Sequence, residues 1–382
     1  MTGIRMMNPS IRQSKRIVIK IGSALVTDEA HGTVRRDWLD ALCDDIAALK
    51  KDGKQVCLVS SGAIALGRRA MGIDQSTRPN GIQLEEKQAA AAIGQIALSA
   101  AYDQAFNERG IIAAQILLTR GDTEDRRRFI NARSTFRTLL EKGAVPVVNE
   151  NDTVATSEIR YGDNDRLAAR VAQMIEADML IQLSTTDGLY TADPRVDNSA
   201  EHVPVVERID DVADMAGDAL PGVSTGGMKS KIDAARLCVD AGIPMMIAKG
   251  VAPHALRGLF EGSARHTLFR ESVRHDSAWK RWIGGSVRPQ GILTIDDGAE
   301  KALRDGKSLL PAGVRAISGQ FSRGDIVAVE NAAHKEIARG LVAYSAADAL
   351  KILGKKSAEI EAILGYAGRA EMIHRDDLVL RP

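Results

Sequence analysis

Short runs of β-branched and other apolar residues alternate with helical patterns along the first 250 residues of the chain. Apolar runs bounded by turn residues predict buried strands at 16–21, 56–59, 111–118, 145–148, 180–183 and 244–247. Apolar residues that recur once per helical turn predict helices at 38–49, 63–71, 87–107 and 125–141. Strands that alternate with helices form βαβ units. The pattern therefore predicts an α/β fold, with a mostly parallel sheet and helices on both of its faces.

The pattern changes after about residue 250. Residues 266–288 are rich in charge, and short strand-like runs follow at 292–295, 314–317, 326–329 and 338–342, separated by turn residues. Short strands broken by turns are typical of a small β domain. The chain is therefore predicted to carry a second, mainly β domain after the α/β domain.

The composition is that of a folded, soluble protein. Of 382 residues, 45% are hydrophobic and 26% are charged, which excludes disorder as the main state. Lysine plus arginine number 51 against 50 aspartate plus glutamate, so the net charge is +1. Proteins that bind nucleic acids or membrane surfaces electrostatically carry an excess of positive charge. The balanced charge argues against both classes.

Neither a disulfide framework nor a membrane segment is indicated. The chain has three cysteines, Cys43, Cys57 and Cys238. They lie far apart without a C-x-x-C pair, so we expect buried, reduced side chains. The first sixteen residues lack the apolar core of a signal peptide. The longest apolar stretch, 89–102, is interrupted by Gln95 and Ser99 and is too short to span a bilayer. A cytoplasmic protein is expected.

Polar residues follow most of the predicted strands. The residues at the strand ends are Lys20-Ile21-Gly22-Ser23, Ser60-Ser61-Gly62, Asn149-Glu150-Asn151-Asp152, Ser184-Thr185-Thr186-Asp187 and Lys249-Gly250. Ligands of open α/β sheets bind beyond the carboxyl ends of the parallel strands. We therefore expect the functional site at this edge of the sheet.

One run has the composition of a phosphate-binding loop. Thr225-Gly226-Gly227-Met228-Lys229-Ser230-Lys231 precedes a helix predicted at 232–239. Adjacent glycines let the backbone approach a phosphate, a helix N-terminus offers free N–H groups, and each lysine adds a positive charge. The spacing is not that of a Walker A loop. On the residues alone, a phosphate-binding loop and a flexible Gly-Lys loop are both open.

Three other runs each have more than one interpretation. Lys20 suits a transferring phosphoryl group at the end of a strand, but it also suits solvent. Ser60 and Ser61 either bind an anion or cap the following helix. The acidic and amide residues at 149–152 and 162–165 bind an ammonium group or a metal, hold lysines in position, or only form turns. Their spacing does not fit a calcium loop.

Taken in order, these motifs resemble the amino acid kinase family, and within it the enzymes that phosphorylate glutamate. The matching runs are VIKIGSALVT (18–27), SSGAIALG (60–67), RRFINARSTFRTLL (127–140), PVVNENDTVAT (146–156), GDNDRLAA (162–169), GLYTADPR (188–195) and TGGMKSK (225–231). The last 94 residues resemble a PUA domain, best in SLLPAGV (308–314) and FSRGDIV (321–327).

The resemblance implies a fold and a division of the chain. The fold is the amino acid kinase fold, an αβα sandwich around a mostly parallel sheet, followed by a small, mainly β, PUA-like domain. The implied segments are an N-terminal extension (1–15), a kinase domain (16–272), a linker (273–288) and the PUA-like domain (289–382).

The resemblance also implies roles for single residues. Lys20 and Lys231 become the lysines that stabilise the transferred phosphate, and Asp165 the residue that organises them. The residues implied in glutamate binding are Ser61, Asp152, Asn164 and Asn149. Those implied in ATP binding are Lys20, Ser184, Thr185, Thr225, Gly226, Gly227, Met228, Lys229, Ser230 and Lys231. Ser184-Thr185 departs from the Thr-Asp of many members, and no residue is expected to bind a metal directly.

The implied reaction transfers the γ-phosphoryl group of ATP to the γ-carboxylate of L-glutamate. It forms L-glutamyl 5-phosphate in the first step of proline biosynthesis. Mg²⁺ is the expected cofactor, proline the expected feedback inhibitor, and a homo-oligomer the expected assembly. The acyl phosphate product is reactive, so hand-off to glutamyl phosphate reductase is expected.

Two alternatives stay open. Acetylglutamate and aspartate kinases belong to the same family, but an acetylglutamate kinase needs no acid for a free ammonium group, and a PUA-like tail would be unusual in either. The second alternative is an RNA-binding protein, because PUA domains commonly bind RNA. Residues 289–382 contain 13 lysine plus arginine and 13 aspartate plus glutamate, so RNA binding is not expected.

Overall fold

The computed structural model describes residues 9–28, 31–73, 82–156, 164–215, 227–271 and 289–381. Contacts divide the chain into two compact units, which we call the first unit (1–274) and the second unit (275–382). The predicted linker, 273–288, lies outside the described residues.

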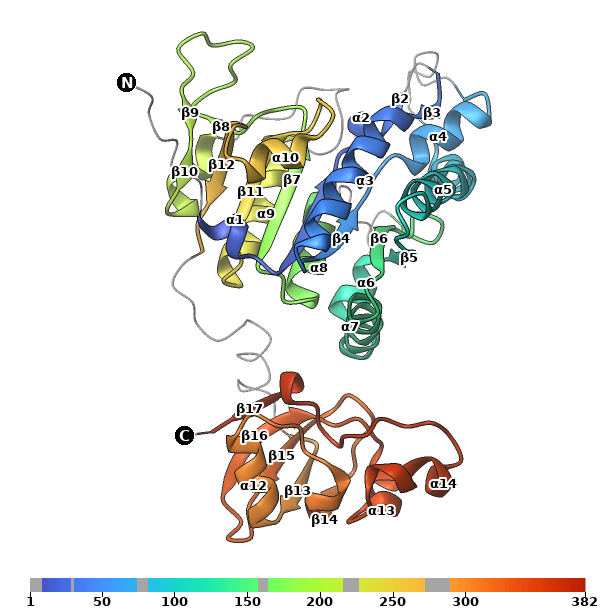
Figure 1. The fold of residues 1–382 in the computed structure, drawn as a ribbon, viewed down its shortest axis with the longest axis vertical. Helices are drawn as coiled ribbons and strands as arrows, with labels where there is room; N and C mark the ends of the chain where they lie inside the picture. The colour runs from blue at the N-terminus through green and yellow to red at the C-terminus, as the bar shows by residue number, and fades with distance from the viewer. Residues whose placement is uncertain are drawn as a thin grey trace. The chain divides into compact units, whose positions relative to one another are not determined.

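The first unit is built on a sheet of eight strands (Figure 1). In spatial order they are β10 (Val205–Val206), β12 (His266–Phe269), β11 (Met245–Lys249), β7 (Met179–Ser184), β1 (Arg16–Ile21), β4 (Gln55–Val59), β6 (Val145–Glu150) and β5 (Ala113–Leu118). Neighbouring strands are parallel, except for the antiparallel pair β11–β12. The mostly parallel sheet is confirmed, and all six predicted strands are present, whereas β10 and β12 were not predicted.

Helices cover both faces of this sheet, so the predicted layering is also confirmed. One face packs against α3 (Arg36–Lys51), α5 (Leu84–Asn107) and α10 (Ala255–Phe260). The other packs against α7 (Arg126–Glu141), α8 (Asn164–Met174) and α9 (Met228–Asp240). Side chains alternate between the faces along a strand. In β1, Ile19 and Ile21 join the core under α3, whereas Lys20 points to the other face and contacts Asp165 of α8.

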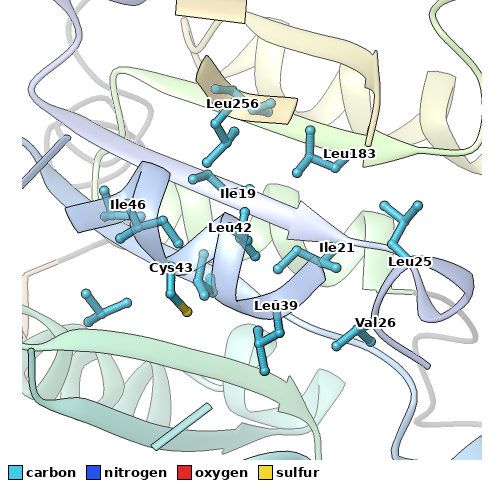
Figure 2. Close-up of a cluster of buried hydrophobic side chains, with 14 of the residues drawn as sticks. Ile19, Ile21, Leu25, Val26, Leu39, Leu42, Cys43, Ile46, Leu183 and Leu256 are labelled. Atoms are coloured by element: carbon cyan, nitrogen blue, oxygen red, sulfur yellow. The ribbon is translucent and has the colours of Figure 1, made fainter. Parts of the chain in front are cut away.

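The core between β1, α3 and α10 is almost free of solvent (Figure 2). Leu39 and Leu42 of α3 lie over Ile21 of β1, and Leu256 of α10 belongs to the same cluster of buried side chains. Fully burying a side chain of this size contributes about 1.5–3 kcal/mol relative to leaving it exposed. This core therefore fixes the strand whose end carries Lys20.

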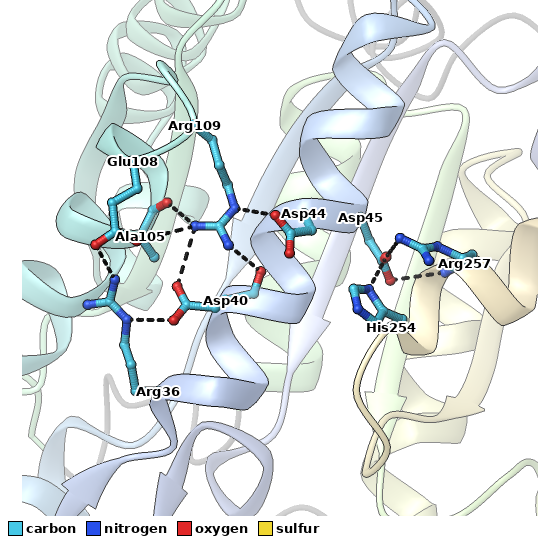
Figure 3. Close-up of polar contacts among 9 residues, drawn as sticks. All are labelled: Arg36, Asp40, Asp44, Asp45, Ala105, Glu108, Arg109, His254 and Arg257. Atoms are coloured by element: carbon cyan, nitrogen blue, oxygen red, sulfur yellow. Dashed lines mark hydrogen bonds and ion pairs between the residues drawn. The ribbon is translucent and has the colours of Figure 1, made fainter.

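Polar contacts connect α3 to the end of α5 on one side and to the start of α10 on the other (Figure 3). Arg109, just after α5, donates to Asp44 of α3 at 2.7 Å. Asp45 of α3 is buried, accepts from the backbone N–H of Arg257 at 3.1 Å, and lies 2.9 Å from His254 Nδ1. Asp45 therefore binds the first turn of α10 to α3.

Helices α4 (Ala63–Ala70) and α5 approach each other backbone to backbone. A Cβ atom on Gly67 would lie 1.7 Å from the carbonyl oxygen of Ala90, and one on Gly94 would lie 1.8 Å from that of Ala63. Only glycine fits at these two positions. Glycine inside a helix costs about 1 kcal/mol relative to alanine, and here it allows α5 to lie against the start of α4.

Smaller elements complete the first unit. They are α1 (Pro9–Gln13), α2 (Ser23–Val26), α6 (Arg120–Glu124), the 3-10 helix η1 (Ile209–Met215) and two antiparallel pairs, β2 (Thr27–Asp28) with β3 (Thr33–Val34) and β8 (Leu189–Tyr190) with β9 (His202–Val203). Part of the predicted extension packs here, because Ile11 belongs to the core under α3. Lys54 Nζ also donates to the carbonyls of Arg12 at 2.8 Å and Ser14 at 2.6 Å.

The second unit has its own sheet and its own core. Its five strands, in spatial order, are β14 (Val314–Gly319), β13 (Gly291–Ile295), β15 (Ile326–Glu330), β16 (Glu336–Leu341) and β17 (Leu378–Leu380). Its helices are α12 (Asp297–Arg304), α13 (Ala346–Ile352) and α14 (Ile360–Leu364), with 3-10 turns η2 (Pro311–Gly313), η3 (Ser357–Glu359) and η4 (Arg375–Asp377). The separate, mostly β domain is confirmed with its four predicted strands, whereas β17 and the helices were not predicted.

Candidate active site

The carboxyl ends of five neighbouring parallel strands meet at one edge of the eight-stranded sheet. The register places Lys20 of β1 between Val59 of β4 and Gln182 of β7. It also places Ser184 of β7 beside Lys249 of β11. The polar strand ends that the sequence predicts as a site therefore come from adjacent strands.

Two lysines share one buried carboxylate at this edge. Lys20 Nζ lies 2.5 Å from Asp165 Oδ1, and Lys231 Nζ lies 2.8 Å from Asp165 Oδ2. Asp165 is fully buried, and each lysine is only 7% exposed. Lys20 comes from β1, Asp165 from the first turn of α8 and Lys231 from the first turn of α9. Three segments far apart in the sequence thus meet in what we call the lysine cluster.

Charge determines the protonation of this cluster. Burial raises the pKa of Asp165, but the attraction of Lys20 and then of Lys231 outweighs it and holds the pKa below its usual range. Asp165 is therefore a carboxylate at neutral pH. With both lysines charged, the lysine cluster carries one excess positive charge, which suits an anionic ligand.

Asn164, the residue before Asp165, is the centre of a cluster of amides and hydroxyls that we call the amide cluster. Asn164, the first residue of α8, donates its amide to the carbonyl of Ser60, to Ser61 Oγ at 3.0 Å and to Asn149 Oδ1 at 2.8 Å. The Ser60 hydroxyl lies 3.0 Å from the hydroxyl of Tyr102 on α5. Three of the four residues expected to bind glutamate are therefore in contact with one another.

Asn149 lies behind this amide cluster. It is only 3% exposed. Its Oδ1 also accepts from the backbone N–H of Glu150 at 2.9 Å, and its Nδ2 donates to Gln95 Oε1 at 2.8 Å. Both ends of the Asn149 side chain are thus bonded to protein groups, so it supports Asn164 from inside.

A cavity of about 420 Å³ opens between α5 and the chain that follows β6. Its size is within the range of small-molecule sites. Asp152, the fourth residue expected to bind glutamate, lines this cavity, and so does Gln95, which binds Asn149. The full lining is Ala63, Ala91, Ala92, Gln95, Ile96, Ser99, Gln115, Leu117, Glu150, Asn151, Asp152 and Thr153. The cavity thus joins an acidic wall to a wall of small apolar side chains.

The Gly-Lys run is helical over more of its length than predicted. Helix α9 begins at Met228 and not at residue 232, so the prediction that Lys229 and Ser230 lie in a loop was wrong. Gly227 has an extended backbone and directly precedes the helix. Bonds to Asp165 from Ser230 Oγ at 3.4 Å and from Lys231 Nζ hold the first turn in place.

Of the other residues expected to bind nucleotide, Ser184 and Thr185 lie at the end of β7 and Lys229 lies on α9. Ser184 ends β7, its carbonyl accepts from the N–H of Gly250 at 2.8 Å, and Thr185 follows it at the surface. Lys229 is exposed on the first turn of α9. Thr225 and Gly226 lie outside the described residues.

Two residues of α5 belong to this region although the sequence motifs do not include them. Gln95 binds Asn149 and lines the cavity, and its Nε2 donates to Ser99 Oγ at 3.1 Å. The sequence did contain a signal. Gln95 and Ser99 interrupt the apolar stretch 89–102 and lie one helical turn apart.

The described residues contain neither a cluster of metal-binding side chains nor a membrane-spanning helix. Within the described residues, no group of three or more His, Cys, Asp or Glu side chains is placed to hold a metal ion. No helix of the described part of the chain is long and apolar enough to cross a membrane. The three cysteines are free and buried, as predicted, and burial raises the pKa of Cys43 to about 12.

Comparison with known proteins agrees with this geometry. Residues 15–249 match the model of the amino acid kinase family, and residues 291–364 match that of the PUA domain. A glutamate 5-kinase from Allorhizobium ampelinum is 56% identical over 373 residues, which are 97% of this chain and 93% of the relative. A glutamate 5-kinase 1 from Mesorhizobium japonicum and a glutamate 5-kinase from Brucella ovis are each 55% identical over 97% of both chains.

These relatives match both units, and the family model covers the strands and helices that carry the lysine cluster and the amide cluster. The resemblance seen in the sequence motifs is therefore confirmed. The chain belongs to the amino acid kinase family and, within it, to the glutamate 5-kinases that carry a C-terminal PUA domain.

Proposed function

We propose that this protein phosphorylates the γ-carboxylate of L-glutamate with ATP, forming L-glutamyl 5-phosphate and ADP in the first step of proline biosynthesis. The observation that carries the proposal is the lysine cluster, in which Lys20 and Lys231 meet on Asp165 beside the amide cluster of Asn164. The lysine cluster suits a phosphoryl group, and the amide cluster suits an amino acid. The names of the relatives support the same activity.

The proposed reaction joins two anions. A γ-carboxylate oxygen attacks the γ-phosphorus, the bond from that phosphorus to the β–γ bridging oxygen breaks, and ADP leaves with the electron pair. Two like unit charges 4 Å apart repel by about 1 kcal/mol in water and by about 4 kcal/mol near a protein surface. Lys20 and Lys231 offset this repulsion. Asp165 orients both ammonium groups before the substrates arrive, so little reorganisation is needed during transfer.

We assign the acceptor to the cavity and the amide cluster. Free glutamate carries an α-ammonium group, and Asp152 on the cavity wall supplies an acid for it. Ser61 and Asn164 bind the amino acid from the side of the lysine cluster. Asn149 is assigned a supporting role behind Asn164, because both ends of its side chain are bonded to protein.

We assign the donor to the first turn of α9 and the end of β7. The first N–H groups of a helix have no partner within the helix, and the positive end of its dipole favours a phosphate. Gly227, Met228, Lys229 and Ser230 are in this position. Thr225 and Gly226 complete the proposed phosphate loop, and Ser184 with Thr185 is the proposed contact to the rest of the nucleotide.

Mg²⁺ is the proposed cofactor, and it enters with ATP. In the part of the chain that the structure describes, no group of three or more His, Cys, Asp or Glu side chains is placed to hold a metal ion, and Asp165 is bonded to two lysines. The ion would therefore be held by the phosphates, where it supplies positive charge to the transferring group.

The proposal also includes partners and organisation. We propose a cytoplasmic homo-oligomer that is inhibited by proline and passes its product to glutamyl phosphate reductase. We assign catalysis to residues 16–272 and a non-catalytic role to the PUA domain at 289–382. Its equal numbers of acidic and basic residues do not favour RNA binding.

Acyl phosphate formation tests the function directly. Hydroxylamine traps an acyl phosphate as a hydroxamate, and the assay compares glutamate, N-acetylglutamate and aspartate with ATP and Mg²⁺. We expect hydroxamate from glutamate at a far higher kcat/KM than from the other two. A preference for either of the other acceptors would show that the acceptor is misassigned.

A further inference from the structure

Three side-chain amides form a chain from α5 to the first turn of α8. Gln95 Nε2 donates to Ser99 Oγ at 3.1 Å, Asn149 Nδ2 donates to Gln95 Oε1 at 2.8 Å, and Asn164 Nδ2 donates to Asn149 Oδ1 at 2.8 Å. Asn149 is 3% exposed and Asn164 9%. The inner part of this amide chain is therefore shielded from water, where hydrogen-bond direction matters most.

Two backbone groups fix the direction of the amide chain. The N–H of Glu150 can only donate, and it donates to Asn149 Oδ1 at 2.9 Å, so the other end of that amide must be nitrogen. The carbonyl of Ser60 can only accept, so the Asn164 atom bonded to it must be Nδ2. A flip of either asparagine would set two donors or two acceptors against each other. Gln95 must therefore offer its oxygen to Asn149.

This direction determines which atom of Asn164 is available to a ligand. Its Nδ2 has two hydrogens, and three protein acceptors already use them: Ser60, Ser61 and Asn149. The remaining polar atom of the side chain is Oδ1, which no donor in the described part of the chain binds. Oδ1 can only accept a hydrogen bond. Of the ionised groups of glutamate, only the α-ammonium donates.

We propose that Gln95 is a positioning residue for the amino-acid substrate. Acting through Asn149, it holds Asn164 with Oδ1 available to the α-ammonium group of the substrate, so that the site selects an amino acid over a plain dicarboxylic acid. This inference rests on the proposed function, and it adds to that function a second protein group, besides Asp152, that recognises the ammonium group.

The packing of α5 supports this role. Gly94, the residue before Gln95, is the position at which α5 lies against the carbonyl of Ala63. Ala63 begins α4, directly after the turn that holds Ser60 and Ser61. The backbone contact therefore fixes Gln95 relative to the same serines that Asn164 binds.

Substitutions at Gln95 distinguish the contribution of its hydrogen-bond acceptor from those of its donor and of its side-chain length. Gln95→Glu keeps an acceptor oxygen for Asn149, and its second oxygen can accept from the Ser99 hydroxyl. Gln95→Met keeps the length and loses the acceptor, whereas Gln95→Lys places a group that can only donate against Asn149 Nδ2. Gln104→Met is the matched control, because Gln104 is an exposed residue of the same helix.

The readouts are the KM for glutamate, the KM for ATP and the inhibition constant of glutarate, which is glutamate without its amino group. We expect Gln95→Met to raise the KM for glutamate about fivefold to tenfold, as the loss of one hydrogen bond does. The glutarate constant and the KM for ATP should change by less than about twofold. Gln95→Lys should be worse than Gln95→Met, and Gln95→Glu and Gln104→Met should stay within about threefold of wild type.

Two results would overturn the inference. Equal losses for glutamate and glutarate would mean that Gln95 only maintains the local structure, and an unchanged KM for glutamate in Gln95→Met would mean that it does not act on the site. A wild-type enzyme that forms no acyl phosphate from glutamate would instead overturn the proposed function, and the inference with it. The wild-type assay thus distinguishes the two failures.

Discussion

Asp165→Asn removes the charge at the centre of the lysine cluster and leaves the side-chain volume almost unchanged. In the wild type, Asp165 is fully buried and binds Lys20 at 2.5 Å and Lys231 at 2.8 Å. The substitution leaves two ammonium groups, each 7% exposed, without that carboxylate. Removing one partner of a buried ion pair costs about 3–5 kcal/mol. We expect the free energy of unfolding of the first unit to fall by this amount.

The effect should depend on pH in a definite direction. Attraction to the two lysines outweighs the effect of burial and holds the pKa of Asp165 below its usual range in the folded protein. A carboxylate of this kind stabilises the fold above its unfolded pKa of about 3.9, and the stabilisation is lost as the pH falls through the folded pKa. The difference in the free energy of unfolding between wild type and Asp165→Asn should therefore be largest at neutral pH and decrease in acid.

Urea denaturation provides the measurement, with hydrogen exchange of peptides from β1 and α8 reporting the first unit alone. Two further variants serve as controls. One is the single variant Lys231→Met, and the other is the double variant that combines Asp165→Asn with Lys231→Met. The double variant should be more stable than Asp165→Asn, because only one of the two buried charges is left. Two results would refute the reasoning. One is a free energy of unfolding for Asp165→Asn within about 1 kcal/mol of the wild-type value, and the other is a double variant that is less stable than Asp165→Asn alone.

Lys231→Ala should lower kcat by about 10² or more and change the KM for glutamate little, since its charge acts mainly on the transition state; ADP release measures this, and a near-normal kcat contradicts it. Asp152→Asn should raise the KM for glutamate roughly tenfold to a hundredfold but penalise N-acetylglutamate much less; equal losses would rule out an ammonium partner. A chain ending at residue 285 should stay active, because every assigned residue precedes 250; a monodisperse, inactive product contradicts this. Asp45→Ala should cost about 1–3 kcal/mol in thermal unfolding by freeing the N–H of Arg257, with kcat unchanged.

The sheet and its edge could be predicted from the sequence, because strands buried on both faces appear as continuous apolar runs. Lys20 and Ser184 are placed by this rule alone, since Lys20 is the last but one residue of one predicted run and Ser184 directly follows another. Asp165 is different. It follows no predicted strand, and the helix that carries it was not predicted. The residues alone left contact with lysines as one of several interpretations, and the family resemblance selected it.

The rest depends on tertiary contacts that have no local signal. The sequence does not show that α9 begins at Met228, because the bonds that hold its first turn reach across to Asp165. Gln95 is visible only as an interruption of an apolar stretch. Its partner Asn149 lies on β6, so only the packing of α5 in the folded protein brings the two side chains together.

The backbone contact between α4 and α5 also has a consequence for protein engineering. Gly94 can accept no side chain, whereas the nearby Ile93 and Ile96 are exposed. Positions that tolerate a side chain therefore alternate with positions that do not along a single helix, which forms one wall of the proposed acceptor cavity. A library designed to change which acid the enzyme accepts can vary Ala92 and Ile96 freely, provided that Gly67 and Gly94 are held constant.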